Sequence, residues 1–349
     1  MATCDIKEPR ETLMGAGPCD IRYEVLKRSG KPNWWCHTHG MDSSAPDGNP
    51  LETCPGVWFE PVPDERQVDL DLEHDFVAIW GVVPPGIQIG PDMGERGKIH
   101  VHRRLTPDGP KDIDGTYDIV RLHHGDSSLV VEGKAAVAYS ISELCDRAIS
   151  ALECRHCGGL HIDEQKFAAF PHRKHLCNSC GRNFIDSSGP SVSNPLAGAH
   201  SQLELPPAPE PLRPDRPLSL DSGTYRTVMI WPSNTAIIST MTRAEETGFH
   251  VHAWNEECTQ VLDDTYSSLS IDGVDIDESE FRVLTVQKAL AHGAPIQSLP
   301  CVQCGHSILD SNAGWIEPST SHVCSACGGE TKTRRKVFLN PLAEKQNYS

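Results

Sequence analysis

The sequence predicts an α+β protein, rich in β-strands, in which one unit of strands, a helix and paired cysteines occurs twice in 349 residues. Short β-branched segments, each bounded by Gly, Pro or Asp, indicate that strands dominate both units. Six landmarks recur in one order: an Ile-Trp pair, an HVH triplet, a segment with Thr-Tyr, two C-x2-C pairs and a closing NPLA. Repetition of this kind predicts two related domains.

The repeat also defines the domain boundaries that we expect. From the first cysteine of one C-x2-C pair to the first of the next is 23 residues in both units (154 to 177, 301 to 324). Convergence would not fix that spacing, so we interpret the chain as a tandem duplication. The predicted organisation is an N-terminal module (1–69), a first repeat (70–197), a linker (198–219), a second repeat (220–343) and a tail (344–349).

Within the first repeat, strands are predicted at 75–83, 98–104, 116–122 and 127–133. A helix is predicted over 140–153, because its apolar residues share one helical face and Ser140 or Ser142 can cap its N-terminus. The corresponding helix of the second repeat, at 285–293, is predicted to be shorter and to stop at Gly293.

The linker between the repeats is rich in proline. Six prolines fall between positions 206 and 217, which favours an extended polyproline II spacer. A PxxP docking ligand is the alternative interpretation.

The repeated cysteines form two sets of four candidate metal ligands. They are Cys154, Cys157, Cys177 and Cys180, and Cys301, Cys304, Cys324 and Cys327. Two C-x2-C turns can direct four thiolates at one ion, and Zn²⁺ takes four such ligands tetrahedrally. The pattern resembles zinc ribbons, and this resemblance implies one structural zinc site per repeat, with iron or a redox dithiol as the alternative. The predicted fold is therefore a tandem duplication of a β-strand, helix and zinc-ribbon domain.

Four histidines lie inside the first ribbon: His156, His161, His172 and His175. Asp163 and His175 have counterparts at equal offset in the second ribbon, Asp310 and His322. The positions of His161 and His172 are taken there by Ile308 and Ser319. We expect His175 and His322 to brace their zinc sites through hydrogen bonds to the ligand shell. An HNH-like nuclease centre in the first ribbon is the alternative.

The N-terminal module contains a further candidate zinc site. Cys19, Cys36, His39 and Cys54 supply a Cys3His set, with Cys36 and His39 in C-x2-H spacing. His37 is an alternative ligand, and three ordinary thiols are the alternative to a site. A third zinc ion is therefore predicted beside the two ribbon ions.

The HVH triplets supply the candidate catalytic residues: His100, His102, His250 and His252. Histidines at i and i+2 on a strand share a face and can bind one metal, an arrangement similar to the histidine pair of cupins. Further ligands could come from Glu256, four positions after His252, or from Asp114, Asp118 or Asp263. The alternative is that the pairs are hydrogen-bonded strand histidines required by the fold.

Charge and composition limit the partners that we expect. The formal net charge of −17 argues against a chain that coats phosphate backbones over its whole surface. Basic residues nevertheless gather at the ribbons: Arg155, Lys166, Arg173, Lys174 and Arg182, and the run KTRRK at 332–336. The start of the sequence has no apolar leader segment, and no run of 18 apolar residues occurs, so a cytoplasmic chain without a membrane span is predicted.

Three functions remain open from the sequence. A zinc-stabilised scaffold that presents ribbon and β surfaces to a protein partner is favoured, with the two repeats packed as an intramolecular pseudo-dimer. A metal-dependent hydrolase or nuclease that uses the HVH pairs is the second hypothesis. A nucleic-acid-binding adaptor that uses the basic ribbon edges is the third.

Overall fold

The chain divides into two compact units, Met1–Arg66 and Gln67–Ser349. The computed structural model describes residues 66–346 except 92, 96, 107–108, 207–214, 234–235 and 241–247, together with the backbone of three N-terminal strands. These are β1 (Ile21–Val25), β2 (Pro32–Cys36) and β3 (Met41–Asp42), which form an antiparallel sheet of their own. The other elements that the structure describes belong to the second unit.

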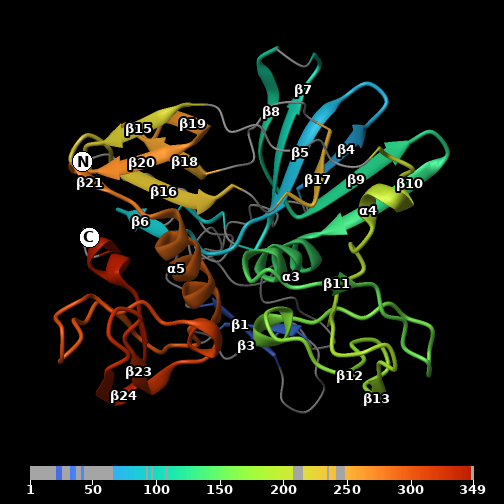
Figure 1. Ribbon diagram of the computed structural model, residues 1–349. Coiled ribbons are helices and arrows are strands. Elements are labelled where there is room, and N and C mark those ends of the chain that lie inside the picture. The colour runs from blue at the N-terminus through green and yellow to red at the C-terminus, as the bar shows by residue number, and fades with distance from the viewer. Residues whose placement is uncertain are drawn as a thin grey trace. The chain divides into compact units, whose positions relative to one another are not determined.

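Two four-stranded sheets form the centre of the second unit (Figure 1). Their strands are β5 (Phe76–Gly81), β6 (Ile87–Ile89), β7 (Ile99–Arg104), β8 (Lys111–Tyr117), β16 (Thr227–Pro232), β17 (Ile238–Ser239), β18 (Phe249–Trp254) and β19 (Gln260–Tyr266). The strand orders are β17-β5-β7-β8 and β6-β16-β18-β19. Each sheet therefore takes three strands from one half of the chain and one short strand from the other half.

This exchange of short strands is reciprocal. Ile238 of β17 is opposite Ile79 of β5, and Ile87 of β6 is opposite Ile230 of β16. All four isoleucines are completely buried. Ile238 belongs to the hydrophobic core of the first half and Ile87 to that of the second. In Figure 1, β6 has the cyan colour of the first half and lies beside the yellow β16. Neither sheet is complete without the other half.

Two tryptophan side chains connect the halves at the same place. The indole N–H of Trp80 donates to the carbonyl oxygen of Ser233 at 3.1 Å. The indole N–H of Trp231 donates to the carbonyl oxygen of Val83 at 2.8 Å. Because both bonds are buried, breaking either would leave a polar group without water or partner.

A three-stranded sheet flanks each four-stranded sheet. Its strands are β4 (Gln67–Asp71), β9 (Ile119–His124) and β10 (Ser127–Glu132) in the first half, and β15 (Pro217–Leu220), β20 (Ser268–Ile271) and β21 (Val274–Asp275) in the second. In both, the first strand pairs parallel with the second, and the second pairs antiparallel with the third. The predicted linker range 198–219 thus includes part of β15 and also the short helix α4 (Ala199–Gln202).

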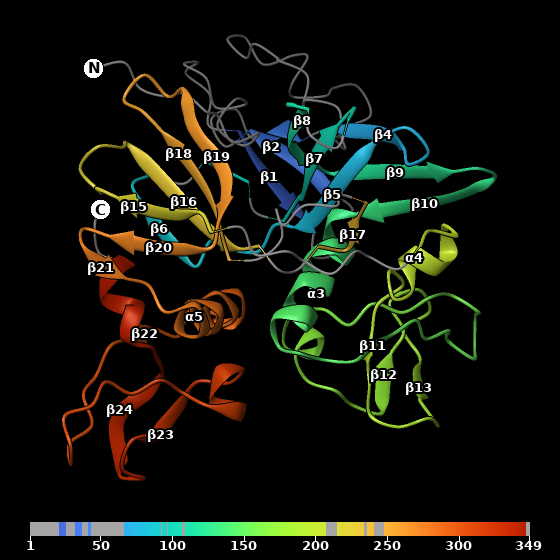
Figure 2. The same cartoon turned by 45° about the horizontal axis from the view of Figure 1, so that its top comes forward.

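One helix from each half packs beneath the sheets, and the two helices contact each other (Figure 2). They are α3 (Gly133–Leu144) and α5 (Glu278–Leu290). Gly81 on β5 touches α3 so closely that a Cβ there would lie 2.1 Å from the Ala136 carbonyl oxygen. The guanidinium of Arg282 on α5 donates to the carbonyl oxygens of Glu143 and Leu144 at 2.7 and 2.6 Å, and so covers the end of α3.

The observed helices correct the predicted ones. The first begins and ends earlier than the predicted 140–153, because Asp146 has a left-handed backbone (φ 52°) and residues 149–150 form a strand. Ser142 is buried inside the helix and donates to the Ala138 carbonyl oxygen at 3.0 Å, so it does not cap the helix. The second helix is one residue longer than the first, not shorter. The segment predicted as one strand at 116–122 is divided between β8 and β9.

The ribbons follow the helices. Their elements are β11 (Ile149–Ser150), η1 (Gln165–Ala168), β12 (Lys174–Leu176), β13 (Asn183–Ile185) and β14 (Val192–Ser193) in the first half, and β22 (Ile296–Gln297), η2 (Asn312–Trp315), β23 (Ser319–Val323), β24 (Glu330–Leu339) and η3 (Pro341–Gln346) in the second. In each NPLA segment the asparagine, Asn194 or Asn340, donates its side-chain amide to a helix carbonyl oxygen. Each ribbon is thereby attached to its own helix. No helix among the described residues is long and apolar enough to cross a membrane.

We expect Ile238→Ala and Ile87→Ala to lower the free energy of unfolding by similar amounts, about 2–5 kcal/mol each. Both changes remove buried methyl groups from a strand that completes the opposite half. Urea denaturation measures the loss, with Val130→Ala, at a side chain that is half exposed, as the control. A loss no larger than that of the control would mean that the exchanged strands contribute little.

Candidate metal centres

Each ribbon brings its four cysteine sulfurs together. In the first, Cys154 Sγ lies 3.7 Å from Cys180 Sγ, and Cys157 Sγ lies 3.7 Å from Cys177 Sγ. The corresponding pairs of the second ribbon are 3.6 and 3.7 Å apart. A tetrahedral ion with Zn–S distances of about 2.3 Å requires sulfurs about 3.8 Å apart. Both Cys4 clusters therefore fit zinc-ribbon modules and could hold zinc ions.

The turns around the sulfurs explain this geometry. In all four C-x2-C turns the glycine after the second cysteine has a φ between 67° and 75°: Gly158, Gly181, Gly305 and Gly328. This left-handed backbone favours glycine and lets backbone N–H groups face the sulfurs. Backbone N–H groups of Cys180 and Ser179 lower the pKa of the Cys177 thiol to about 6, and those of Gln303 and Cys304 do the same for Cys301. Thiolates, the metal-binding form, are favoured at these positions.

The predicted Cys3His site of the N-terminal module lies outside the described residues. Cys19, His37, His39 and Cys54 are not described, and Cys36 is known only as the last backbone position of β2.

The HVH pairs of the two halves meet in one cluster. The Nε2 atoms of His100 and His102 are 2.8 Å apart, and those of His250 and His252 are 2.7 Å apart. Between the pairs, the rings of His100 and His252 have centroids 4.9 Å apart. All four side chains are buried. The exchange of strands places these triplets, which are 150 residues apart in the sequence, against each other.

The strand next to each HVH triplet contributes a carboxylate. The register places Asp114 opposite His102 and Asp263 opposite His252. Asp263 Oδ1 lies 3.2 Å from His252 Nε2 and 3.6 Å from His102 Nε2. Ligands of one ion with metal–nitrogen distances of about 2.0–2.1 Å lie about 3.0–3.4 Å apart. Two overlapping groups could hold an ion: His100, His250, His252 and Asp263; and His100, His102, Asp114 and Asp263.

Lys111 breaks the symmetry of this cluster. Its Nζ lies 2.8 Å from Asp114 Oδ2, 3.2 Å from Asp263 Oδ1 and 3.4 Å from His102 Nε2. The matching place in the second half is held by Gln260, whose amide donates to Asp263 at 2.5 Å. A permanent cation thus stands in the first half of the cluster and a neutral amide in the second.

Burial and the carboxylates set the charges in the cluster. Burial and the neighbouring histidines hold the pKa of His100 and of His250 well below the usual value. Burial also opposes charge on His252, but hydrogen bonds to Asp263 and Glu95 outweigh it and raise the pKa of His252 to about 9. Burial likewise opposes charge on Lys111, but the carboxylates of Asp263 and Asp114 together outweigh it, so the pKa of Lys111 is raised.

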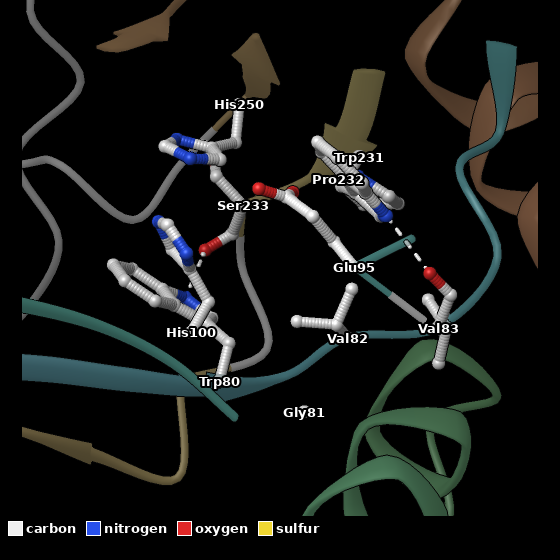
Figure 3. Close-up of a pocket in the computed structure, with 10 residues that line it drawn as sticks. All are labelled: Trp80, Gly81, Val82, Val83, Glu95, His100, Trp231, Pro232, Ser233 and His250. Atoms are coloured by element: carbon white, nitrogen blue, oxygen red, sulfur yellow. Dashed lines mark hydrogen bonds between the residues drawn. The ribbon is translucent and has the colours of Figure 1, made fainter. Parts of the chain in front are cut away.

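A small cavity adjoins the cluster (Figure 3). It is lined by Trp80, Gly81, Val82, Val83, Glu95, His100, Trp231, Pro232, Ser233 and His250. Figure 3 shows the Glu95 carboxylate extending toward the space between His250 and Trp231. Glu95 Oε2 also lies 3.2 Å from His252 Nδ1. The cavity is therefore mainly apolar, with polar lining at Ser233, Glu95 and two histidines of the cluster.

The structure thus brings together all four candidate histidines with Asp114 and Asp263. Asp118 instead lies near Lys98, with 3.9 Å between Oδ1 and Nζ, and Glu256 is exposed. Sequence reasoning missed Glu95 and Lys111. A signal existed for Glu95, because Glu245 precedes the second HVH triplet by the same five residues; Lys111 has no such counterpart.

Comparison with known proteins adds no relative, since no family model, curated protein or solved structure matches this chain.

We expect Cys177→Ser and Cys324→Ser each to reduce bound zinc by one ion per chain and to destabilise the protein. Binding of zinc to such sites contributes on the order of 10 kcal/mol to folding, because the unfolded chain has no preformed site. Elemental analysis after gel filtration measures the first effect and thermal unfolding the second. Cys145→Ala, at a buried free cysteine outside both clusters, is the control and should keep its zinc.

Proposed function

We propose that the protein is a zinc-stabilised metalloenzyme whose two halves together form one hydrolytic metal centre. The observation that carries this proposal is the convergence of both HVH pairs and Asp263 beside a cavity that Glu95 lines. Histidine and carboxylate ligands suit zinc, iron or manganese, and a centre next to a cavity can reach a substrate. The two ribbon sites, closed by four cysteines, would hold structural zinc.

The charges favour a single divalent ion. Three carboxylates, of Asp114, Asp263 and Glu95, surround the histidines, and Lys111 supplies a permanent cation. His252, with a pKa of about 9, carries a proton until an ion takes the place of that proton. The three carboxylates then exceed Lys111 by two negative charges, which one divalent ion would neutralise. Because the ammonium of Lys111 already stands against Asp114 and His102, we assign the ion to His100, His250, His252 and Asp263.

The chain's residues have distinct roles in this proposal. A bound ion would supply an acidified water and polarise the substrate. Glu95 accepts a proton from the attacking water as the water oxygen bonds to the carbonyl carbon or phosphorus. The bond from that atom to the leaving group then breaks, and Glu95 returns the proton to the leaving group. The same carboxylate lies 3.2 Å from His252 Nδ1 and thereby favours the ring orientation with Nε2 toward the centre. Trp80 and Trp231 enclose the cavity and exclude bulk water.

We also propose that the two halves arose by tandem duplication and that the N-terminal module binds zinc. Support for a tandem duplication comes from the equal strand order of the two sheets, the reciprocal exchange of β6 and β17, and the paired roles of Asn194 and Asn340. The domain boundaries, the intramolecular pseudo-dimer and a Cys3His zinc ion are parts of the same proposal.

A scaffold role is the second candidate, and the first ribbon favours it. Four of its apolar side chains are about half exposed: Phe167, Phe170, Leu176 and Ile185. Apolar groups gathered on a small surface mark interaction sites. Under this role, partner binding would be lost in Cys177→Ser and kept when Glu95 is changed.

We expect His252→Ala to remove one metal ion per chain and His102→Ala to keep it. Both side chains are buried to the same degree, but only His252 belongs to the proposed ligand set, whereas His102 faces Lys111. Elemental analysis of both variants, normalised to the wild-type protein, measures the difference. Equal metal content in the two variants would remove the assignment of the ion to the second half.

We expect Glu95→Gln to lower the rate of hydrolysis by about 10²–10⁴-fold while the metal content stays unchanged. The amide oxygen can still accept from His252 but is a poor base. Turnover of bis(4-nitrophenyl) phosphate and 4-nitrophenyl acetate by the metal-loaded protein measures the effect. Glu256→Gln, at an exposed glutamate, should keep the wild-type rate. Wild-type turnover in Glu95→Gln would exclude Glu95 as the base.

A further inference from the structure

A second histidine cluster lies within the first ribbon, separate from its cysteines. Three ring nitrogens surround the carboxylate of Asp163: Nε2 of His161 at 2.8 Å, Nε2 of His172 at 3.3 Å and Nδ1 of His175 at 3.3 Å. His161, His175 and Asp163 are at most 4% exposed. These separations are those of ligands around one ion with metal–nitrogen distances of about 2.0–2.1 Å.

Hydrogen bonds fix the orientation of two members. Nδ1 of His172 lies 2.9 Å from the carbonyl oxygen of Phe170, which can only accept, so this nitrogen carries the hydrogen. In the neutral ring, Nε2 then presents a lone pair to the Asp163 carboxylate, and two acceptors face each other. Asp163 is itself held in place because its Oδ2 accepts from the backbone N–H of Ser193 at 2.7 Å. A cation between Nε2 and the carboxylate resolves the conflict.

The second ribbon shows the same position without the extra histidines. His322 Nδ1 lies 2.7 Å from Asp310 Oδ1, and Asp310 Oδ2 accepts from the backbone N–H of Leu339. Ile308 is fully buried where the first ribbon has His161. The aspartate–histidine pair is therefore sufficient for folding a ribbon. Through this aspartate, His175 and His322 brace the last strand of each ribbon, β14 and β24. Two further histidines are present in the first ribbon only.

An aromatic ring separates this cluster from the cysteines. Phe184 packs against Cys154 and Cys177. It also contacts the rings of His175 and His161, with centroids 5.2 and 5.5 Å away. The histidine cluster thus has its own set of ligand atoms and does not draw on the Cys4 set.

We propose that His161, His172, His175 and Asp163 form an additional divalent-metal site of the zinc class, present in the first ribbon and missing from the second. Nitrogen and carboxylate ligands in this number suit Zn²⁺ in tetrahedral coordination. His172 is the most exposed of the four side chains, at 15%, and gives the ion a route to solvent. The site is independent of the central cluster and of the function proposed for it.

The test transfers the residues of the second ribbon into the first. The full-length double variant His161→Ile with His172→Ser reproduces Ile308 and Ser319, a combination that the second ribbon already folds with. We expect it to lose one zinc ion per chain relative to the wild-type protein. Cobalt substitution should leave the thiolate charge-transfer bands of both Cys4 sites at full intensity. The converse variant, Ile308→His with Ser319→His, should gain one ion.

Unchanged zinc content in the His161→Ile, His172→Ser variant would overturn the proposal. It would mean that the histidines share protons with Asp163 and hold no metal. Should that variant fail to fold, anomalous scattering at the zinc edge from wild-type crystals decides the question. A peak between His161, His172 and His175 is the expected result, and featureless density there would overturn the site.

Discussion

The reciprocal exchange of β6 and β17 is the constraint on which the second unit depends. Two strands of three and two residues complete the sheets of opposite halves, and the buried tryptophan hydrogen bonds run across the same junction. Because each sheet is finished by the other half, the faces that carry the HVH triplets must oppose each other. The packing of α3 against α5 follows from the same arrangement.

The near-symmetry of the two halves brings the histidine and aspartate side chains together. The positions at which the halves differ give these side chains different surroundings. The two triplets and the two facing aspartates are equivalent in register and in residue type, whereas Lys111 and Gln260 occupy equivalent positions but differ in charge. The same division occurs in the ribbons, where a shared aspartate–histidine pair is supplemented by two histidines in the first ribbon only. In the ribbons the shared pair serves the fold, and in both places the unmatched residues differ in polarity or charge.

Local sequence patterns predicted the arrangement of the HVH histidines and of the ribbon cysteines. Alternation along a strand placed both histidines of each triplet on one face, and C-x2-C spacing placed the sulfurs. The helix was displaced because Asp146 turns the chain where the apolar periodicity continues toward residue 153. The strand exchange could not be foreseen, since Ile87–Ile89 and Ile238–Ser239 carry no local mark of which sheet they join. Glu95 and Lys111 escaped notice because their roles depend on that long-range pairing.

The exchange also bears on how the chain matures during synthesis. The edge of β5 at Ile79 is covered only when Ile238 has been synthesised, 159 positions later (79 to 238). At about 5–20 residues per second this delay lasts roughly 10–30 s. During that interval β5 presents unpaired backbone groups beside apolar side chains, the kind of edge that invites pairing with another nascent chain. The amount of native protein that a cell obtains would then depend on whether a chaperone covers this edge and on how widely ribosomes are spaced along the message.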